Sequence, residues 1–137
     1  MELPDQGIES LVPHSDGAEV KQLGRRATFI HLDDFAQDWK DEVIAGTEFA
    51  CENSDRLIID LRGNNGGVFP VRKGLAEKLV HEMALYCSNK RRDSIQEVYL
   101  EPVQNGYGGP LVVLIDVLSA SSAEEFSGAL QAICRAV

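Results

Sequence analysis

Two segments of this sequence carry residues that could act on a carbonyl group. Ser121 stands where a buried strand is predicted to give way to a helix, and a helix dipole stabilises negative charge at its N-terminus. The glycine-rich turn at residues 63–67 ends another buried strand and leaves backbone N–H groups uncovered. Such N–H groups can bind an anion or donate to a developing oxyanion. A serine nucleophile and an oxyanion site are therefore one interpretation of the two segments.

Each segment alone also has a purely structural interpretation. Asn65-Gly66 is typical of a tight turn that needs left-handed residues. Ser121 and Glu124 have the spacing of a capping box, as do Ser122 and Glu125, and capping does not exclude catalysis. The glycine turn is not a phosphate-binding loop, because no Gly-Lys-Ser/Thr follows it, and it does not fit Gly-x-Gly-x-x-Gly.

The elements that must position these segments alternate between strands and helices. Nearly continuous apolar runs at 57–61 and 111–115 are typical of strands buried on both faces of a parallel sheet. The order predicts an α/β fold with a mostly parallel sheet, whose sites lie at the carboxyl ends of the strands. After a polar lead-in at residues 1–25, the patterns predict strands at 27–32, 57–61, 95–100 and 111–115, helices at about 34–51, 71–88 and 122–133, and the start of a further strand at 136–137.

Composition limits the classes of partner. The 137 residues carry 22 acidic and 13 basic side chains, a net charge of −9 that would repel a phosphate backbone, so no nucleic-acid partner is expected. No apolar run is long enough for a membrane span. Cys51, Cys87 and Cys134 are scattered, without Cys-x-x-Cys, and are expected to be buried free thiols. We expect neither a cofactor nor a metal.

Taken together, the two segments resemble the C-terminal-processing (tail-specific) serine protease family. That family pairs a strand ending in Asp-Leu-Arg-x-Asn-x-Gly-Gly with a second strand leading into Ser-Ala-Ser-x-x-Glu. The matching residues here are 60–67 and 119–124. The resemblance covers roughly residues 26–137 and implies a partial protease core domain with a crotonase-like (ClpP-like) fold of repeated β-α-β units, apparently truncated at its C-terminus.

The resemblance also implies roles for four residues. Ser121 matches the family nucleophile, and Glu124 matches a glutamate that helps to orient the catalytic base. The backbone N–H groups of Gly67 and Ser122 match the oxyanion hole. The implied activity is that of a serine endopeptidase that cleaves peptide or protein chains through an acyl-enzyme. Family members are often exported or organellar, and the compartment of this protein stays open.

The general base is the missing part of this pattern. Family proteases use a lysine some two dozen residues after the serine, within a Gly-Lys-Gly-type segment, so we expect the base beyond residue 137. His31 is a weaker candidate on the first strand, and His14 and His81 are set aside. A sheet without its next strand would expose an edge, so truncation, a completing chain or a homo-oligomer is expected.

Two other functions compete with a peptidase. Some relatives of the family keep the fold as non-catalytic binding modules, which need no serine at position 121; its presence favours the enzyme. A crotonase-like fold could also process a thioester and bind coenzyme A. Only Arg62 lies near the glycine turn to support that alternative.

Overall fold

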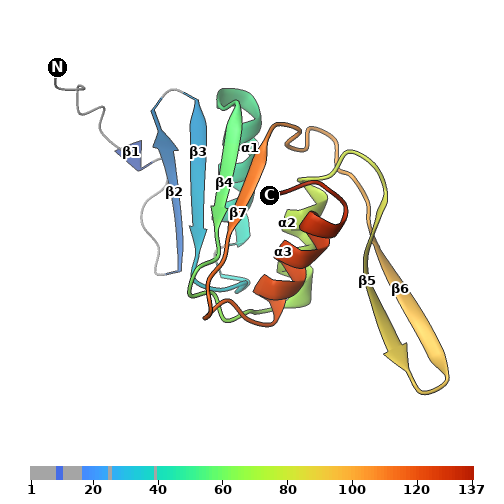
Figure 1. Ribbon diagram of the computed structural model, residues 1–137. Helices are drawn as coiled ribbons and strands as arrows, with labels where there is room; N and C mark the ends of the chain where they lie inside the picture. The colour runs from blue at the N-terminus through green and yellow to red at the C-terminus, as the bar shows by residue number, and fades with distance from the viewer. Residues whose placement is uncertain (1–8, 11–16, 25, 39) are drawn as a thin grey trace.

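The computed structural model describes residues 9–10, 17–24, 26–38 and 40–137 (Figure 1). Seven strands and three helices lie in this part of the chain. In chain order they are β1 (Glu9–Ser10), β2 (Ala18–Leu23), β3 (Ala27–Leu32), α1 (Lys40–Asn53), β4 (Arg56–Asp60), α2 (Phe69–Glu77), β5 (Ala84–Arg91), β6 (Ser94–Leu100), β7 (Leu111–Leu114) and α3 (Ser122–Ala132).

Five of the strands form one sheet in the order β1-β2-β3-β4-β7. The pairs β3–β4 and β4–β7 are parallel, whereas β1 and β2 add to the β3 edge as antiparallel strands. Helix α1 connects β3 to β4, and α2 with the β5–β6 hairpin connects β4 to β7. These two crossovers are β-α-β connections, and they confirm the predicted α/β class. The hairpin extends away from the sheet (Figure 1).

All three helices pack against one face of this sheet. Ile30 and Ile59 are paired in register and fully buried on that face. Helix α1 approaches it closely, because a Cβ added to Gly46 would lie 2.7 Å from a methyl carbon of Val20. Helix α3 is anchored by Phe126, whose ring centroid lies 5.4 Å from that of Phe35.

The opposite face of the sheet carries a different set of side chains. Phe29, Ile58 and Val112 are neighbours in register there, and Val112 is 39% exposed. The next row toward the carboxyl ends contains His31 and Asp60. The two faces therefore separate an apolar, helix-covered core from a partly open surface.

Most predicted elements are confirmed to within one residue at each end. The strand predicted at 27–32 is β3, and the helix predicted at 122–133 is α3. The strand expected to begin at 136–137 stays a prediction, but Val137 accepts the N–H of Val113 at 2.9 Å and donates to the carbonyl of Leu111 at 3.3 Å. These two bonds are those of a strand parallel to β7.

Three sequence-based predictions are wrong. The helix predicted at 71–88 ends at Glu77, and β5 begins at Ala84. The helix predicted from residue 34 begins at Lys40, because Phe35 instead forms an isolated parallel bridge with Gly67. The cysteines are not all buried: Cys51 and Cys87 are half-buried and Cys134 is exposed.

The lead-in predicted at residues 1–25 contains a strand that its polarity concealed. Residues 18–23 form β2, which pairs along its whole length with β3. Ala18 and Val20 are buried, whereas the residues between and after them are only half-buried. That alternation is the period of a strand with one covered face. The domain boundary at residue 25 stays a prediction.

Candidate active site

Two loops at the carboxyl ends of β4 and β7 are held together by hydrogen bonds from backbone and side-chain groups. The N–H of Gly63 donates to Asp116 Oδ1 at 3.0 Å, and the N–H of Ala120 donates to the carbonyl of Asn64 at 2.9 Å. The hydroxyl of Ser119 donates to the carbonyl of Leu61 at 2.8 Å. The motifs at 60–67 and 119–124 are therefore adjacent in space, as the parallel pairing of their strands requires.

The buried side chain of Asn64 holds the glycine turn in place through two hydrogen bonds. It is fully buried, and its Nδ2 donates to the carbonyl of Leu32 at 3.0 Å. Its Oδ1 accepts the N–H of Gly66 at 2.9 Å. One amide thus joins the end of β3 to the turn after β4, and both of its ends are satisfied, as a buried polar group requires.

Ser121 occupies a sharp turn at the N-terminus of α3. Its φ of 52° and ψ of −116° lie in a region that non-glycine residues rarely adopt, and its side chain is exposed. The predicted capping box is present, and the Glu124 carboxylate accepts the Ser121 N–H at 3.0 Å. Strained backbone of this kind persists where surrounding contacts impose it, and it clusters at functional sites.

Glycines 66 and 67 permit close contact on both sides of the turn. A Cβ on Gly66 would lie 2.9 Å from the Cβ of Ser121 and 3.2 Å from the Ser122 nitrogen. A Cβ on Gly67 would lie 2.6 Å from backbone atoms of Phe35. Both residues also have positive φ, 116° and 147°. The turn therefore needs glycine at both positions for its conformation and for its packing.

The two N–H groups expected to form an oxyanion hole lie in these same segments. In the bridge with Gly67, Phe35 bonds the carbonyl of Gly66 and the N–H of Val68, so the N–H and carbonyl of Gly67 itself face the other way. That carbonyl accepts the Ser122 hydroxyl at 2.9 Å. Within the described part of the chain, no acceptor receives the N–H of Gly67 or of Ser122.

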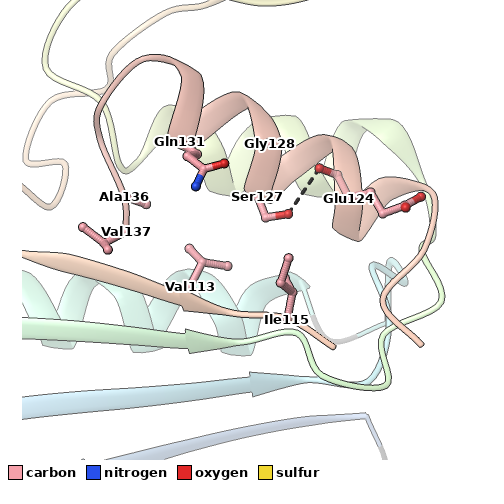
Figure 2. Close-up of a pocket in the computed structure, with 8 residues that line it drawn as sticks. All are labelled: Val113, Ile115, Glu124, Ser127, Gly128, Gln131, Ala136 and Val137. Atoms are coloured by element: carbon pink, nitrogen blue, oxygen red, sulfur yellow. Dashed lines mark hydrogen bonds between the residues drawn. The ribbon is translucent and has the colours of Figure 1, made fainter. Parts of the chain in front are cut away.

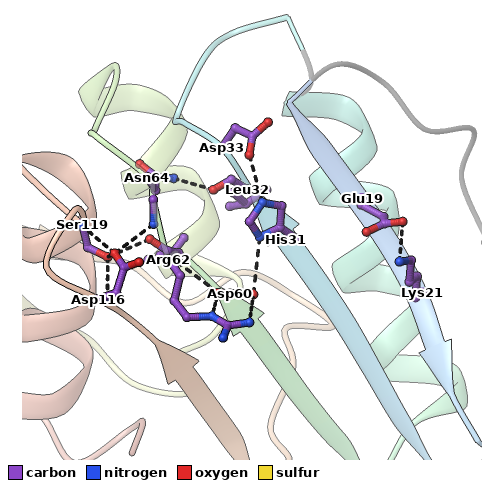
Figure 3. A network of polar contacts seen from close by, with 12 residues as sticks. Glu19, Lys21, His31, Leu32, Asp33, Asp60, Arg62, Asn64, Asp116 and Ser119 are labelled. Carbon is purple, nitrogen blue, oxygen red and sulfur yellow. Dashed lines mark hydrogen bonds and ion pairs between the residues drawn. The ribbon is translucent and has the colours of Figure 1, made fainter.

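A polar network surrounds the carboxyl ends of β3 and β4 on the face opposite the helices (Figure 3). Arg62 donates through Nε and Nη2 to both carboxylate oxygens of Asp60, at 2.9 and 2.8 Å. This hydrogen bonding lowers the pKa of Asp60. His31 lies between Asp33, at 2.9 Å, and Asp60, at 3.5 Å. None of these contacts joins His31 to Ser121.

No described side chain is placed as a base for Ser121. Lys73 pairs with Glu77, and Lys78 lies 3.3 Å from Glu48. Among the residues outside the masked ranges, no lysine or histidine makes a hydrogen bond or ion pair with Ser121. His81 is exposed, and His14 lies outside the described residues.

A pocket of about 350 Å³ lies between β7 and α3, next to the turn that contains Ser121 (Figure 2). Glu124 belongs to both features, because its carboxylate accepts the Ser121 N–H and its side chain also borders the pocket. The lining is apolar on the strand side and polar on the helix side: Val113, Ile115, Glu124, Ser127, Gly128, Gln131, Ala136 and Val137.

Arg72 is a residue near the site that the sequence analysis missed. It lies in α2 and is only 6% exposed, and its Nη1 is 3.4 Å from the hydroxyl of Ser122. Its spacing to Leu75, Ala76 and Leu79, which are all buried, places it on the inner stripe of the helix. This spacing could have identified Arg72 from the sequence, because an arginine on an otherwise apolar helix stripe needs a buried partner.

Two further features bear on the class of protein. Among the described residues, no group of three or more His, Cys, Asp or Glu side chains could hold a metal ion. No helix in the described ranges has the length and apolar character to cross a membrane.

Comparison with known proteins gives one consistent family. The family model for "Peptidase family S41" matches residues 26–137. A carboxyl-terminal-processing protease from Picosynechococcus sp. is 34% identical over 124 residues, 89% of this chain and 29% of that protein. A chloroplastic C-terminal processing peptidase from Tetradesmus obliquus is 32% identical over 120 residues, 84% of this chain and 24% of that protein.

A solved structure agrees with these sequence matches. The photosystem II D1 C-terminal processing protease superposes with a TM-score of 0.72 at 26% identity, covering 81% of this chain and 29% of that one. The chain therefore spans less than a third of the length of the two sequence relatives and of this solved structure.

Proposed function

Because the chain belongs to peptidase family S41, we propose that it supplies the nucleophile and the oxyanion hole of a serine peptidase that cleaves peptide chains. The observation that carries this proposal is the placement of Ser121. Its strained turn at the start of α3 lies against Gly66, beside the unpaired N–H groups of Gly67 and Ser122. A nucleophile next to two such donors is the arrangement that acyl transfer needs.

The proposed reaction proceeds through an acyl-enzyme. Ser121 Oγ attacks the scissile carbonyl carbon while a base takes the hydroxyl proton, and the carbonyl electron pair moves to oxygen. The N–H groups of Gly67 and Ser122 donate to this oxyanion. Collapse of the intermediate breaks the C–N bond, and the protonated base gives its proton to the leaving amine. Water then attacks the ester by the same route and regenerates Ser121.

We assign the base to a lysine beyond residue 137, with Glu124 as the residue that orients it. Val137 is already paired in parallel with β7, so a strand continuing from it would run past Ile115 toward the Ser121 turn. The pocket between β7 and α3 lies along this path, and Glu124 borders it. An unassisted serine hydroxyl is a weak nucleophile, so the base is essential to the proposal.

The alternatives have less support. A non-catalytic binding module has no need for a serine in a strained turn against a glycine. Coenzyme A binding would depend on Arg62, whose guanidinium is bound to Asp60. The two unpaired N–H groups would also suit a thioester carbonyl, so the placement of Ser121 is what favours the peptidase.

The test uses the protein expressed through to the stop codon of its gene. An unstructured peptide should be cleaved, and a fluorophosphonate should label Ser121. Ser121→Ala should lose cleavage by at least about 10³-fold, because the nucleophile carries most of the rate. Ser94→Ala, on the exposed hairpin, is the matched control. Equal cleavage by the Ser121→Ala protein would overturn the proposal, and peptide binding without cleavage by the wild type would favour the binding module.

A further inference from the structure

Arg72 is buried beneath the first turn of α3. Its guanidinium carbon lies 4.8 Å from the ring centroid of Phe69 and 5.5 Å from that of Tyr86, and the guanidinium pairs with Glu125. Glu125 belongs to the same helical turn as Ser122. The cation thus connects α2 to the turn that carries one of the two proposed oxyanion donors.

A directed chain of hydrogen bonds runs from Arg72 to the other donor segment. The Ser122 hydroxyl has one hydrogen, and its Oγ lies 2.9 Å from the carbonyl of Gly67, which can only accept. The hydroxyl therefore donates to Gly67 and accepts from Arg72 Nη1, at 3.4 Å. The guanidinium cannot accept, so the order of donors and acceptors is fixed from Arg72 to Gly67.

Stability alone does not favour an arginine at this position. Its neighbours on the buried stripe are apolar, and taking a cation out of water is costly even when it is paired. Two buried polar atoms here, Arg72 Nε and the hydroxyl of Tyr86, have no hydrogen-bond partner among the described residues. Burial also raises the pKa of Tyr86, so this hydroxyl stays neutral beside the cation. An apolar side chain would avoid these costs.

We infer that Arg72 is a positioning residue for the oxyanion hole. Through Ser122 it sets the orientation of the Gly67 carbonyl, and through Glu125 it anchors the turn that presents the Ser122 N–H. The inference rests on the proposed function, since it assigns the N–H groups of Gly67 and Ser122 to the oxyanion. It predicts that Arg72 affects reactions that pass through an oxyanion and spares those that do not.

Replacing Ser121 with cysteine separates the two kinds of reaction, and the experiment needs no general base. In Ser121→Cys protein, the thiolate attacks p-nitrophenyl acetate through a tetrahedral oxyanion and expels p-nitrophenolate. The same thiolate displaces iodide from iodoacetamide with no oxyanion. Peptide mass spectrometry gives the modification rate at each position, and exposed Cys134 is the internal reference. The readout is the ratio of acylation to alkylation at position 121.

Two substitutions test the inference in this background. Arg72→Met should lower the ratio at least about tenfold and leave the rate of alkylation unchanged. Complete loss of one oxyanion donor lowers a reaction rate about 10²–10³-fold, and misplacing the donors should cost a part of that. Ser122→Ala keeps its backbone N–H but removes the hydroxyl link, so it should lower the ratio similarly. It also tests the inference if Arg72→Met does not fold. Combining the two should lower the ratio little further, because they interrupt one chain.

Arg135→Met is the matched control. Arg135 also stacks on an aromatic ring, that of Tyr107 at 5.8 Å, and donates to the Tyr107 carbonyl at 2.9 Å, but it makes no contact with the Ser121 turn. Its loss should lower stability and leave the ratio unchanged.

The possible outcomes distinguish the positioning role of Arg72 from the proposed oxyanion hole. A parent ratio no higher at position 121 than at Cys134 would overturn both the oxyanion hole and the role of Arg72. A high parent ratio that neither Arg72→Met nor Ser122→Ala lowers would overturn the positioning role alone.

Discussion

Gly66 and Ser121 are in direct contact across the two site loops: a Cβ on Gly66 would lie 2.9 Å from the Cβ of Ser121 and 3.2 Å from its Oγ. Because Gly66 has no Cβ, the Ser121 side chain can pack directly against the glycine turn. Any larger residue at position 66 must displace either the serine or the turn.

Gly66→Ala should therefore damage both stability and site geometry. Its φ of 116° is unfavourable for alanine by about 1–3 kcal/mol, and the overlap with Ser121 adds to that cost. Urea unfolding measures the loss. Gly74→Ala is the control, because an added Cβ in α2 meets no atom within 4 Å; it should gain up to about 1 kcal/mol from helix propensity. Equal stability of the two variants would contradict this account of the turn.

Asn64→Leu should destabilise the fold by about 2–5 kcal/mol. The substitution leaves the carbonyl of Leu32 and the N–H of Gly66 without their partner, and each buried unsatisfied group costs about 1–3 kcal/mol. Chemical denaturation is the measurement. Asn65→Leu, at the exposed neighbouring position, should change stability by less than about 0.5 kcal/mol. If the two variants unfold alike, the buried amide has no special role.

Arg62→Gln should change how stability depends on acid. The pKa of Asp60 is lowered in the folded protein, chiefly by the hydrogen bond from Arg62. A lowered carboxyl pKa stabilises the fold above the unfolded value of about 3.9, and this contribution is lost as pH falls through the folded value. The variant should be less stable at pH 7 and lose less stability between pH 4 and pH 2. Urea titrations across this range test it, with Arg56→Gln, an exposed arginine at the other end of β4, as the control.

Phe126→Ala should cost about 3–5 kcal/mol, because Phe126 is fully buried against Phe35 and anchors α3 to the sheet. Thermal unfolding measures the effect, and Ile95→Ala, at a site 65% exposed on the hairpin, should have little influence. Since α3 carries Ser121 at its N-terminus, the alanine variant should also react more slowly with a serine-directed probe. A melting temperature close to that of the wild type would show that α3 is held by other contacts.

The strands that position the site could be predicted because their signal is local. The runs at 57–61 and 111–115 are apolar except for Asp60, and they form the neighbouring parallel strands β4 and β7. Their parallel pairing then brings the Gly66 and Ser121 turns to one edge, as expected for sites at the carboxyl ends of strands. The placement of Ser121, Ser122, Gly67 and Glu124 follows, although their catalytic roles stay predictions.

The helix predicted at 71–88 failed because distant residues decide its end. The carbonyl of Lys78 accepts the N–H of Tyr107, and the following residues pair with β6 as a hairpin. Leu75 and Leu79 are buried as the helical period predicts, but Met83 is 66% exposed. A period of four over such a segment also fits a strand once a partner strand is present.

Arg72 and Phe35 show the same limit at the site. Phe35 continues the apparent helical stripe in sequence, yet its backbone bonds Gly66 and Val68 across the molecule. The partners of Arg72 are Ser122 and Glu125, which are far from it in the chain. Only the fold brings these residues together.

The long crossover between β4 and β7 has a consequence for when the site can exist. The glycine turn follows β4 and Ser121 follows β7, while α2 and the entire hairpin lie between them in the chain. Closing so long a loop is entropically costly and slow compared with forming a helix or a hairpin. We therefore expect the contact between the Gly66 and Ser121 turns to form late in folding, after α2 and the hairpin.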